Sequence, residues 1–143
     1  MTLWYHFQDM SDKTIFSKII DREMPAHFVY EDDVCVVLMD AFPSVPGQTL
    51  VIPRTPVDYL FDLPEDTYQH ILKVTKKIAK AMDLALTTSR TCIVVEGFQV
   101  PHIHIRLYPL AKDETALTNV LLHTEPADQN ELQKNCEAIK KAL

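Results

Sequence analysis

The fold of this 143-residue chain is decided by one stretch, Gly97-Phe98-Gln99-Val100-Pro101-His102-Ile103-His104-Ile105-Arg106-Leu107-Tyr108-Pro109. From His102 onward polar and apolar residues alternate, which is the period of a half-buried β-strand whose successive side chains point to opposite faces. The isoleucines and the leucine are expected to enter a core. The polar set should line the other face, with neighbouring Cα atoms about 6.5 to 7 Å apart; it comprises His102, His104, Arg106 and Tyr108. Three potential cations in a row repel one another unless an anion is bound, so we interpret the stretch as an anion site.

The composition is that of an ordinary globular protein. Apolar residues make up 47% of the chain and charged residues 24%, and 143 residues suffice for one domain with a proper core, so we expect a single domain over residues 1–143. The formal net charge is −6 and no Lys/Arg block offsets it. Extended nucleic-acid binding needs a basic face and is therefore not expected, whereas a small anionic ligand held by a few local donors is compatible with this charge.

The cysteines and the apolar runs help to predict the cellular location of the protein. Cys35, Cys92 and Cys136 are odd in number and widely spaced, so they suggest neither a disulfide framework nor a metal clip. We see no apolar signal region in residues 1–12, and the longest apolar run, Val34 to Met39, is too short to cross a bilayer. No membrane contact is expected, and a cytoplasmic location is the default prediction.

The remaining periodicities predict an α+β fold with a mainly antiparallel sheet. Strands are expected at His27–Tyr30 and Val34–Met39, joined by an acidic turn, and at Thr49–Ile52, Thr91–Val95 and His102–Tyr108. A long amphipathic helix is predicted from about Pro64 to Ala85, because apolar residues recur there with a period of 3.6. The predicted strands are interrupted by only one long helix, which favours an antiparallel sheet with that helix across it.

Three further segments have weaker signals. A short helix is predicted around Ile15–Ile20, ending near Asp21, and a terminal helix from Pro126 onward through Leu132, Cys136, Ile139 and Leu143. We interpret Lys112 to Asn119 as a polar connector. The mixed segment Met1–Lys13 supports no assignment beyond a flexible arm.

The order of several motifs resembles the histidine triad (HIT) family of nucleotide-binding hydrolases and transferases. The resemblance runs from about Thr14 to Pro109, so we divide the chain into a family-like core, residues 14–110, and a C-terminal appendage, residues 111–143. The motifs that carry it are Thr14-Ile-Phe-Ser-Lys-Ile-Ile20, Tyr30-Glu-Asp-Asp33, Asp40-x-x-Pro43-x-x-Pro46-Gly47, Leu50-Val-Ile-Pro53 and His102-Ile-His-Ile-Arg106. An isolated His-x-His is weak evidence, whereas this ordered series is specific.

The resemblance implies a fold and a chemistry. It implies a HIT-like fold, a five-stranded antiparallel sheet with the long helix across one face, here with an extra C-terminal helix, and a homodimer formed partly through that helix. It also implies a bound nucleotide, with a purine favoured, whose α-phosphate lies against the histidine strand. By resemblance, His104 attacks the phosphorus and forms a nucleotidyl-histidine intermediate, and His102 orients His104 or contacts the phosphate. A neutral imidazole can be a nucleophile at pH 7 without a strong base. The competing interpretation is a pair of ordinary strand histidines.

Further site residues follow from the same comparison. Asp40 matches the acidic residue that grips the ribose hydroxyls, although an Asp that caps the Pro-rich loop explains its position equally well. Gln99, Arg106 and Gln48 are the candidate phosphate ligands. Three apolar residues correspond to the base pocket, or else belong to the core; they are Ile15, Phe16 and Leu38. Gly97 either lets the backbone approach a ligand or simply makes a tight turn.

The chain departs from the family pattern at three histidine positions. Arg106 stands at the third triad position, and Gln48 and Pro56 replace two others. Arginine binds phosphate but cannot deliver a proton, so phosphate leaving groups should be favoured over amines. The Cys-x-x-Cys that some members use for zinc is Thr14-x-x-Ser17 here, so no metal and no other cofactor is expected.

Two functional hypotheses remain open. In the first, the protein is an enzyme that releases a nucleoside monophosphate through His104. In the second, it is a nucleotide-binding module without effective turnover, in which Arg106 and His102 hold the phosphate. Retention of His104 and Asp40 favours the enzyme, and the substituted histidines favour the module. In the appendage, His123 could reach the cleft of either subunit.

Overall fold

The computed structural model describes residues 13–121 and 125–143. The predicted flexible arm therefore lies outside the described residues except for Lys13, and so does His123. Among the described residues, no helix combines the length and the apolar character needed to cross a membrane.

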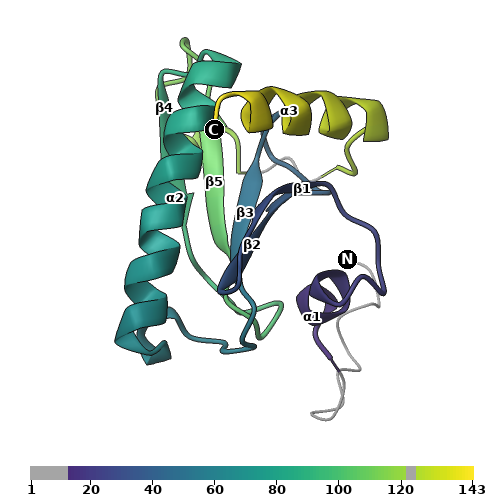
Figure 1. The fold of residues 1–143 in the computed structure, drawn as a ribbon. Coiled ribbons are helices and arrows are strands. Elements are labelled where there is room, and N and C mark those ends of the chain that lie inside the picture. The colour runs from purple at the N-terminus through teal and green to yellow at the C-terminus, as the bar shows by residue number, and fades with distance from the viewer. Residues whose placement is uncertain (1–12, 122–124) are drawn as a thin grey trace.

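One five-stranded antiparallel sheet forms the centre of the molecule, with strand order β1-β2-β3-β5-β4 (Figure 1). The strands are β1 (Phe28–Glu31), β2 (Cys35–Met39), β3 (Thr49–Pro53), β4 (Arg90–Val94) and β5 (Ile105–Leu110). β2 and β3 are buried at every position, as expected for continuous apolar runs in the middle of a covered sheet. The α+β prediction with a five-stranded antiparallel sheet is confirmed.

Two helices cover one face of this sheet. The long helix α2 (Glu65–Leu86) and the terminal helix α3 (Gln129–Lys141) pack against each other and against the strands (Figure 1). α2 begins with Glu65 and Asp66, which favour its positive end, and its buried stripe includes Ile71, Ile78 and Met82. Ile103, Ile105 and Leu107 enter this core, as their alternation predicts.

The short helix α1 (Ile15–Ile20) covers the opposite face. Thr14 caps it by accepting a hydrogen bond from the Ser17 amide, at 3.1 Å. Phe16 is the buried residue of α1, and it packs with Val36, Leu38, Leu50 and Ile52 in a second, smaller core. α1 therefore covers the face of the sheet that faces away from α2.

The histidine strand begins later than predicted. β5 starts at Ile105, not at His102, because the preceding amides bond elsewhere: His102 N donates to Val100 O and Ile103 N donates to Val57 O, both at 2.8 Å. The two histidines therefore lie on an extended approach to the strand, held by loop contacts. Their side chains nevertheless keep the alternation, with Ile103 in the α2 core and His104 on the α1 face.

The C-terminal predictions need two corrections. α3 begins at Gln129, capped by the Asp128 carboxylate, and it ends at Lys141, so Leu143 lies beyond it and is exposed. The predicted polar connector contains a 3-10 turn, η3 (Leu117–Asn119), whose Leu117 packs against a small cluster around Tyr108. A second such turn, η2 (Leu60–Asp62), precedes α2. Propensity misses such turns because tertiary packing decides them.

Candidate functional site

Neighbouring strands align the candidate residues on one face. Leu38 of β2 pairs with Leu50 of β3, which in turn pairs with Arg106 of β5. Side chains two positions apart share a face, so His104 lies on the same face as Arg106. Asp40 follows β2, and its amide continues the pairing by donating to Gln48 O at 2.9 Å. The α1 face of the sheet thus gathers Asp40, His104 and Arg106.

His102 is completely buried and both of its ring nitrogens have partners. Nε2 lies 2.7 Å from the carbonyl oxygen of Pro53, and Nδ1 lies 2.8 Å from the hydroxyl of Thr14. A carbonyl oxygen only accepts, so the proton must be on Nε2. Burial lowers the pKa of His102 below its ordinary 6.5, the Pro53 carbonyl opposes this, and His104 adds to the lowering. The neutral ring then accepts the Thr14 proton at Nδ1.

His104 has the opposite tautomer. Its Nδ1 lies 2.8 Å from the carbonyl oxygen of His102, so Nδ1 carries the proton and Nε2 is unprotonated. Burial lowers the pKa of His104, and the charge of Arg106 lowers it further; the His102 carbonyl and the carboxylates of Asp40 and Glu96 act in the other direction. The geometry therefore produces a neutral imidazole with an unprotonated Nε2, which is the form that can attack an electrophile.

Arg106 lies directly beside that nitrogen. One guanidinium nitrogen, Nη2, is 3.4 Å from His104 Nε2, and Nη1 is 4.0 Å from the carboxylate of Glu96. The Arg106 side chain is 27% exposed, so part of the guanidinium faces solvent. A permanent cation with several donors at the exposed edge of a nucleophile can hold an anionic group there.

Phe16 covers both imidazoles from α1. Its ring centroid lies 4.9 Å from that of His104 and 5.8 Å from that of His102. His104 is only 3% exposed as a result, so the face is not the open one that an alternating strand suggests. Of the other two predicted base-pocket residues, Ile15 is exposed and Leu38 is buried in the small core beside Phe16.

The Pro-rich loop holds Asp40 through Gln48. Asp40 Oδ1 accepts from the Phe42 amide at 2.9 Å, and Oδ2 accepts from the Gln48 side-chain amide at 2.6 Å. The Gln48 oxygen in turn accepts from Ser44 N at 2.8 Å, and Gln48 is 2% exposed. In this structure the Gln48 amide is occupied within the loop and positions Asp40. A phosphate contact from Gln48 stays a prediction.

The β4–β5 loop carries the other two predicted residues. Gln99 is exposed, and its phosphate contact stays a prediction. Gly97 has φ +85°, and a Cβ there would lie 2.9 Å from the carbonyl oxygen of Asp58. Gly97 is therefore needed for the turn and for a close approach to another loop, which is the simpler of the two interpretations.

A cluster of three possible metal-ligand atoms was missed by the sequence analysis, because its members are far apart in the chain. Ligand atoms of Asp32, Cys35 and His70 lie within 4.8 Å of one another. Asp32 already accepts hydrogen bonds from the Val34 and Cys35 amides, the Tyr30 hydroxyl and His70 Nε2. Burial raises the pKa of the Cys35 thiol to about 12, which opposes the thiolate that a metal needs. We assign this cluster to locking the β1–β2 hairpin against α2.

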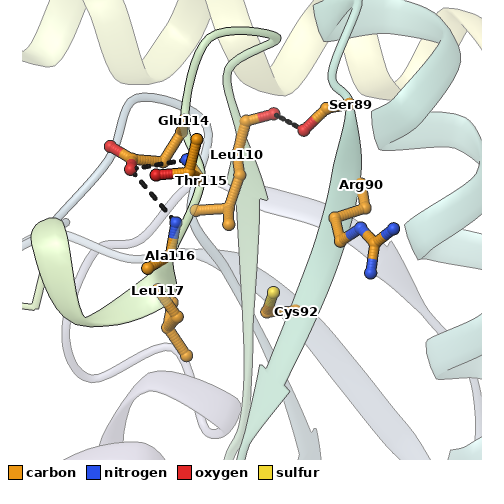
Figure 2. Close-up of a pocket in the computed structure, with 8 residues that line it drawn as sticks. All are labelled: Ser89, Arg90, Cys92, Leu110, Glu114, Thr115, Ala116 and Leu117. Atoms are coloured by element: carbon orange, nitrogen blue, oxygen red, sulfur yellow. Dashed lines mark hydrogen bonds between the residues drawn. The ribbon is translucent and has the colours of Figure 1, made fainter.

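A cavity of about 540 Å³ lies away from the histidines (Figure 2). It is formed where β4 begins and β5 ends, with the connector that follows; its lining includes Arg90, Cys92, Leu110, Glu114 and Leu117. The Glu114 carboxylate is turned back onto the amides of its own loop. None of the predicted site residues lines this cavity.

Comparisons with known proteins identify a family that matches this chain. The model of the HIT domain family matches residues 21–113. An uncharacterized HIT-like protein of Synechococcus elongatus is 40% identical over 104 residues, covering 68% of this chain and 90% of that protein. An uncharacterized HIT-like protein of Synechocystis is 37% identical over 105 residues, with the same coverage.

Solved structures agree along nearly the whole chain. A HIT-like protein involved in cell-cycle regulation from Bartonella henselae, solved with an unknown ligand, superposes with a TM-score of 0.82 at 29% identity, covering 96% of this chain and 100% of that one. A zinc-bound histidine triad family protein from Mycobacterium smegmatis gives a TM-score of 0.75 at 25% identity, covering 92% of this chain and 95% of that one. The chain belongs to the HIT domain family.

Proposed function

We propose that this protein is a nucleotide hydrolase or nucleotidyl transferase that uses His104 as its nucleophile. The observation that carries the proposal is the hydrogen bond from His104 Nδ1 to the His102 carbonyl, because it leaves Nε2 unprotonated beside a cationic side chain. Family membership supports the substrate class, and a hypothetical histidine triad nucleotide-binding protein from Sulfolobus tokodaii has the same fold.

The proposed reaction has two steps. The Nε2 lone pair of His104 attacks the α-phosphorus, a P–N bond forms, and the P–O bond to the leaving group breaks, with the electron pair leaving on oxygen. Water or another hydroxyl acceptor then attacks the same phosphorus, its proton passes to solvent, and the P–N bond breaks with its electron pair returning to Nε2. This releases the nucleoside monophosphate or its transferred form and restores the imidazole. Arg106 offsets charge on the phosphoryl oxygens, and Asp40 accepts hydrogen bonds from the ribose hydroxyls.

The remaining expectations join this proposal. We assign Gln99 to a phosphate contact from its loop, and Ile15, Phe16 and Leu38 to the side of the nucleoside base, with a purine favoured. Arg106 takes the place of the third triad histidine. A cytoplasmic location stays a prediction.

The test is release of AMP from a diadenosine polyphosphate. His104→Ala should abolish release while nucleotide binding persists, because it removes the nucleophile and leaves Arg106 and Asp40 in place. Thr91→Val, which removes a hydroxyl that bonds Asp83 and none of the proposed site residues, should release AMP at the wild-type rate. Unchanged release by His104→Ala would exclude the nucleophile.

One observation favours the alternative, a nucleotide-binding module without turnover. Arg106 Nη2 lies 3.4 Å from the nitrogen that would attack, so a guanidinium proton competes for the same lone pair. In that case wild type and His104→Ala would both bind AMP and neither would release it from the dinucleotide.

We further propose that the protein is a homodimer formed partly through α2. β4 is an edge strand, and apolar side chains are exposed on both elements: Leu84 of α2 at 77% and Ile93 of β4 at 53%. Sedimentation equilibrium should give twice the chain mass for wild type. Leu84→Glu should shift the protein toward the monomer, whereas a wild type that sediments as a monomer would contradict the proposal.

A further inference from the structure

We propose that Thr14 is a positioning residue for the histidine pair: its hydroxyl donates to His102 Nδ1, fixes the His102 ring between α1 and β3, and so holds the backbone carbonyl that orients His104. This inference rests on the proposed function for its catalytic consequence. Its geometric part concerns contacts that exist whether or not the protein turns over a nucleotide.

The hydroxyl of Thr14 has only one proton to give. It lies 2.8 Å from His102 Nδ1 and 3.1 Å from the Ser17 hydroxyl, and it accepts the Ser17 amide at 3.1 Å. Because Pro53 O requires the His102 proton on Nε2, the neutral ring presents a lone pair at Nδ1. The Thr14 proton therefore points to His102, and the Ser17 hydroxyl becomes a donor to Thr14.

The hydrogen bond between Thr14 and His102 is buried. Thr14 is 8% exposed and His102 is 0% exposed, so water cannot readily replace either partner. Among the described residues, every buried side-chain nitrogen and oxygen has a hydrogen-bond partner, and loss of the Thr14 hydroxyl would leave Nδ1 without one.

The contact reaches His104 through the backbone. Residues 102–104 precede β5, so the sheet ladder does not hold them, and the amides of His102 and Ile103 donate to the loop carbonyls of Val100 and Val57. The side chain of His102 is thus a main anchor of its own backbone, with one nitrogen on Pro53 and one on Thr14. The carbonyl of that same residue accepts the Nδ1 proton of His104 and so determines which nitrogen is free to react.

The structural part is tested by nitrogen NMR of the histidine rings, with signals assigned by His102→Gln and His104→Gln. Wild type and Thr14→Ser should both show His102 protonated at Nε2, with the Nδ1 signal of a hydrogen-bond acceptor. In Thr14→Val the His102 Nδ1 signal should move to that of a free lone pair, and the His104 Nδ1–H signal should shift with it. Loss of the helix cap alone would lower stability without these changes.

The catalytic part is tested with diadenosine tetraphosphate. Thr14→Val should lower kcat by about tenfold to a hundredfold with KM little changed, because misplacing a catalytic group affects the transition state more than binding. Thr14→Ser should restore kcat. The matched control is Thr91→Val, which removes a hydroxyl that donates to the Asp83 carboxylate of α2 at 2.7 Å and not to a histidine; it should leave kcat unchanged.

Three results would overturn the proposal: unchanged His102 ring signals in Thr14→Val, a Thr14→Ser variant as impaired as Thr14→Val, or an equal loss of kcat in Thr91→Val. If Thr14→Val does not fold, Thr14→Cys replaces it, because a thiol is a weak donor of similar size. If the ring signals respond as expected but wild type releases no AMP, the proposed function fails and the positioning of His102 stands.

Discussion

At the scale of single residues, the chemistry of the site depends on which ring nitrogen of each histidine is protonated. Two backbone carbonyls, those of Pro53 and His102, each accept from one ring nitrogen and so assign opposite tautomers to His102 and His104. A histidine with one nitrogen committed to a carbonyl needs no strong base to become a nucleophile. The chemistry proposed for His104 thus depends on a backbone atom two residues away.

Arg106 leads to a prediction about leaving groups. Its guanidinium can bind a departing phosphate but cannot protonate an amine, because arginine does not release its proton in proteins. We expect diadenosine polyphosphate to be turned over much faster than an adenosine phosphoramidate, as measured by kcat/KM for each. Arg106→His should raise the relative rate on the phosphoramidate, since an imidazolium can donate a proton.

The control for this prediction is Arg106→Lys, which keeps a cation of high pKa and should keep the preference for phosphate leaving groups. Comparable turnover of the two substrates by the wild-type protein would contradict the role given to Arg106.

At the scale of elements, the β1–β2 hairpin depends on the carboxylate of Asp32. Burial disfavours the charged form of Asp32, but hydrogen bonds from Cys35 N, His70, Val34 N and Tyr30 outweigh it and hold its pKa below the usual range. The hydrogen bond between the Tyr30 hydroxyl and the Asp32 carboxylate raises the pKa of Tyr30 to about 12. The turn is therefore fixed by a charge-assisted network that also ties the hairpin to α2 through His70.

We expect Asp32→Ala to lower the free energy of unfolding by about 1.5 to 3 kcal/mol, the usual effect of removing a hydrogen-bonded charged group. Urea denaturation measures this directly. The matched control is Asp33→Ala at the exposed neighbouring position, which should change stability by less than about 0.5 kcal/mol. Equal effects of the two substitutions would show that the network is not what stabilises the turn.

The elements also show what a sequence can and cannot predict. Alternation correctly assigned Ile103, Ile105 and Leu107 to the core, because a period of two survives even where the strand ladder is absent. The predicted start of β5 is wrong because the amides of His102 and Ile103 donate to loop carbonyls. Such hydrogen bonds leave no periodic pattern in the sequence. The contact of Thr14 with His102 joins residues 88 positions apart, and only the folded chain brings them together.

At the scale of the whole molecule, the two buried histidines link folding to pH. Burial lowers the pKa of both His102 and His104 below 6.5, so between the folded and unfolded pKa values the unfolded chain binds more protons. Their contribution to stability is therefore complete above about pH 6.5 and is lost as the pH falls below it. Asp32, whose pKa is lowered from 3.8, contributes only to a loss at still lower pH.

We expect the free energy of unfolding to decrease as the pH falls below about 6.5. Because unfolding lets at most two histidines take up a proton, the slope should not exceed about 2.7 kcal/mol per pH unit. Urea denaturation between about pH 5 and pH 8 gives the slope. His104→Gln should reduce it by removing one titrating group. A stability that is flat across this range in the wild type would contradict the burial of neutral imidazoles.

The most direct measurement of the central claim is the mass of the protein trapped during turnover of a diadenosine polyphosphate. Rapid quenching followed by peptide mapping should show one adenylyl group attached through a P–N bond to His104, and His104→Ala should show none. An adenylyl group on another residue, or AMP release by the His104→Ala variant at the wild-type rate, would contradict the account.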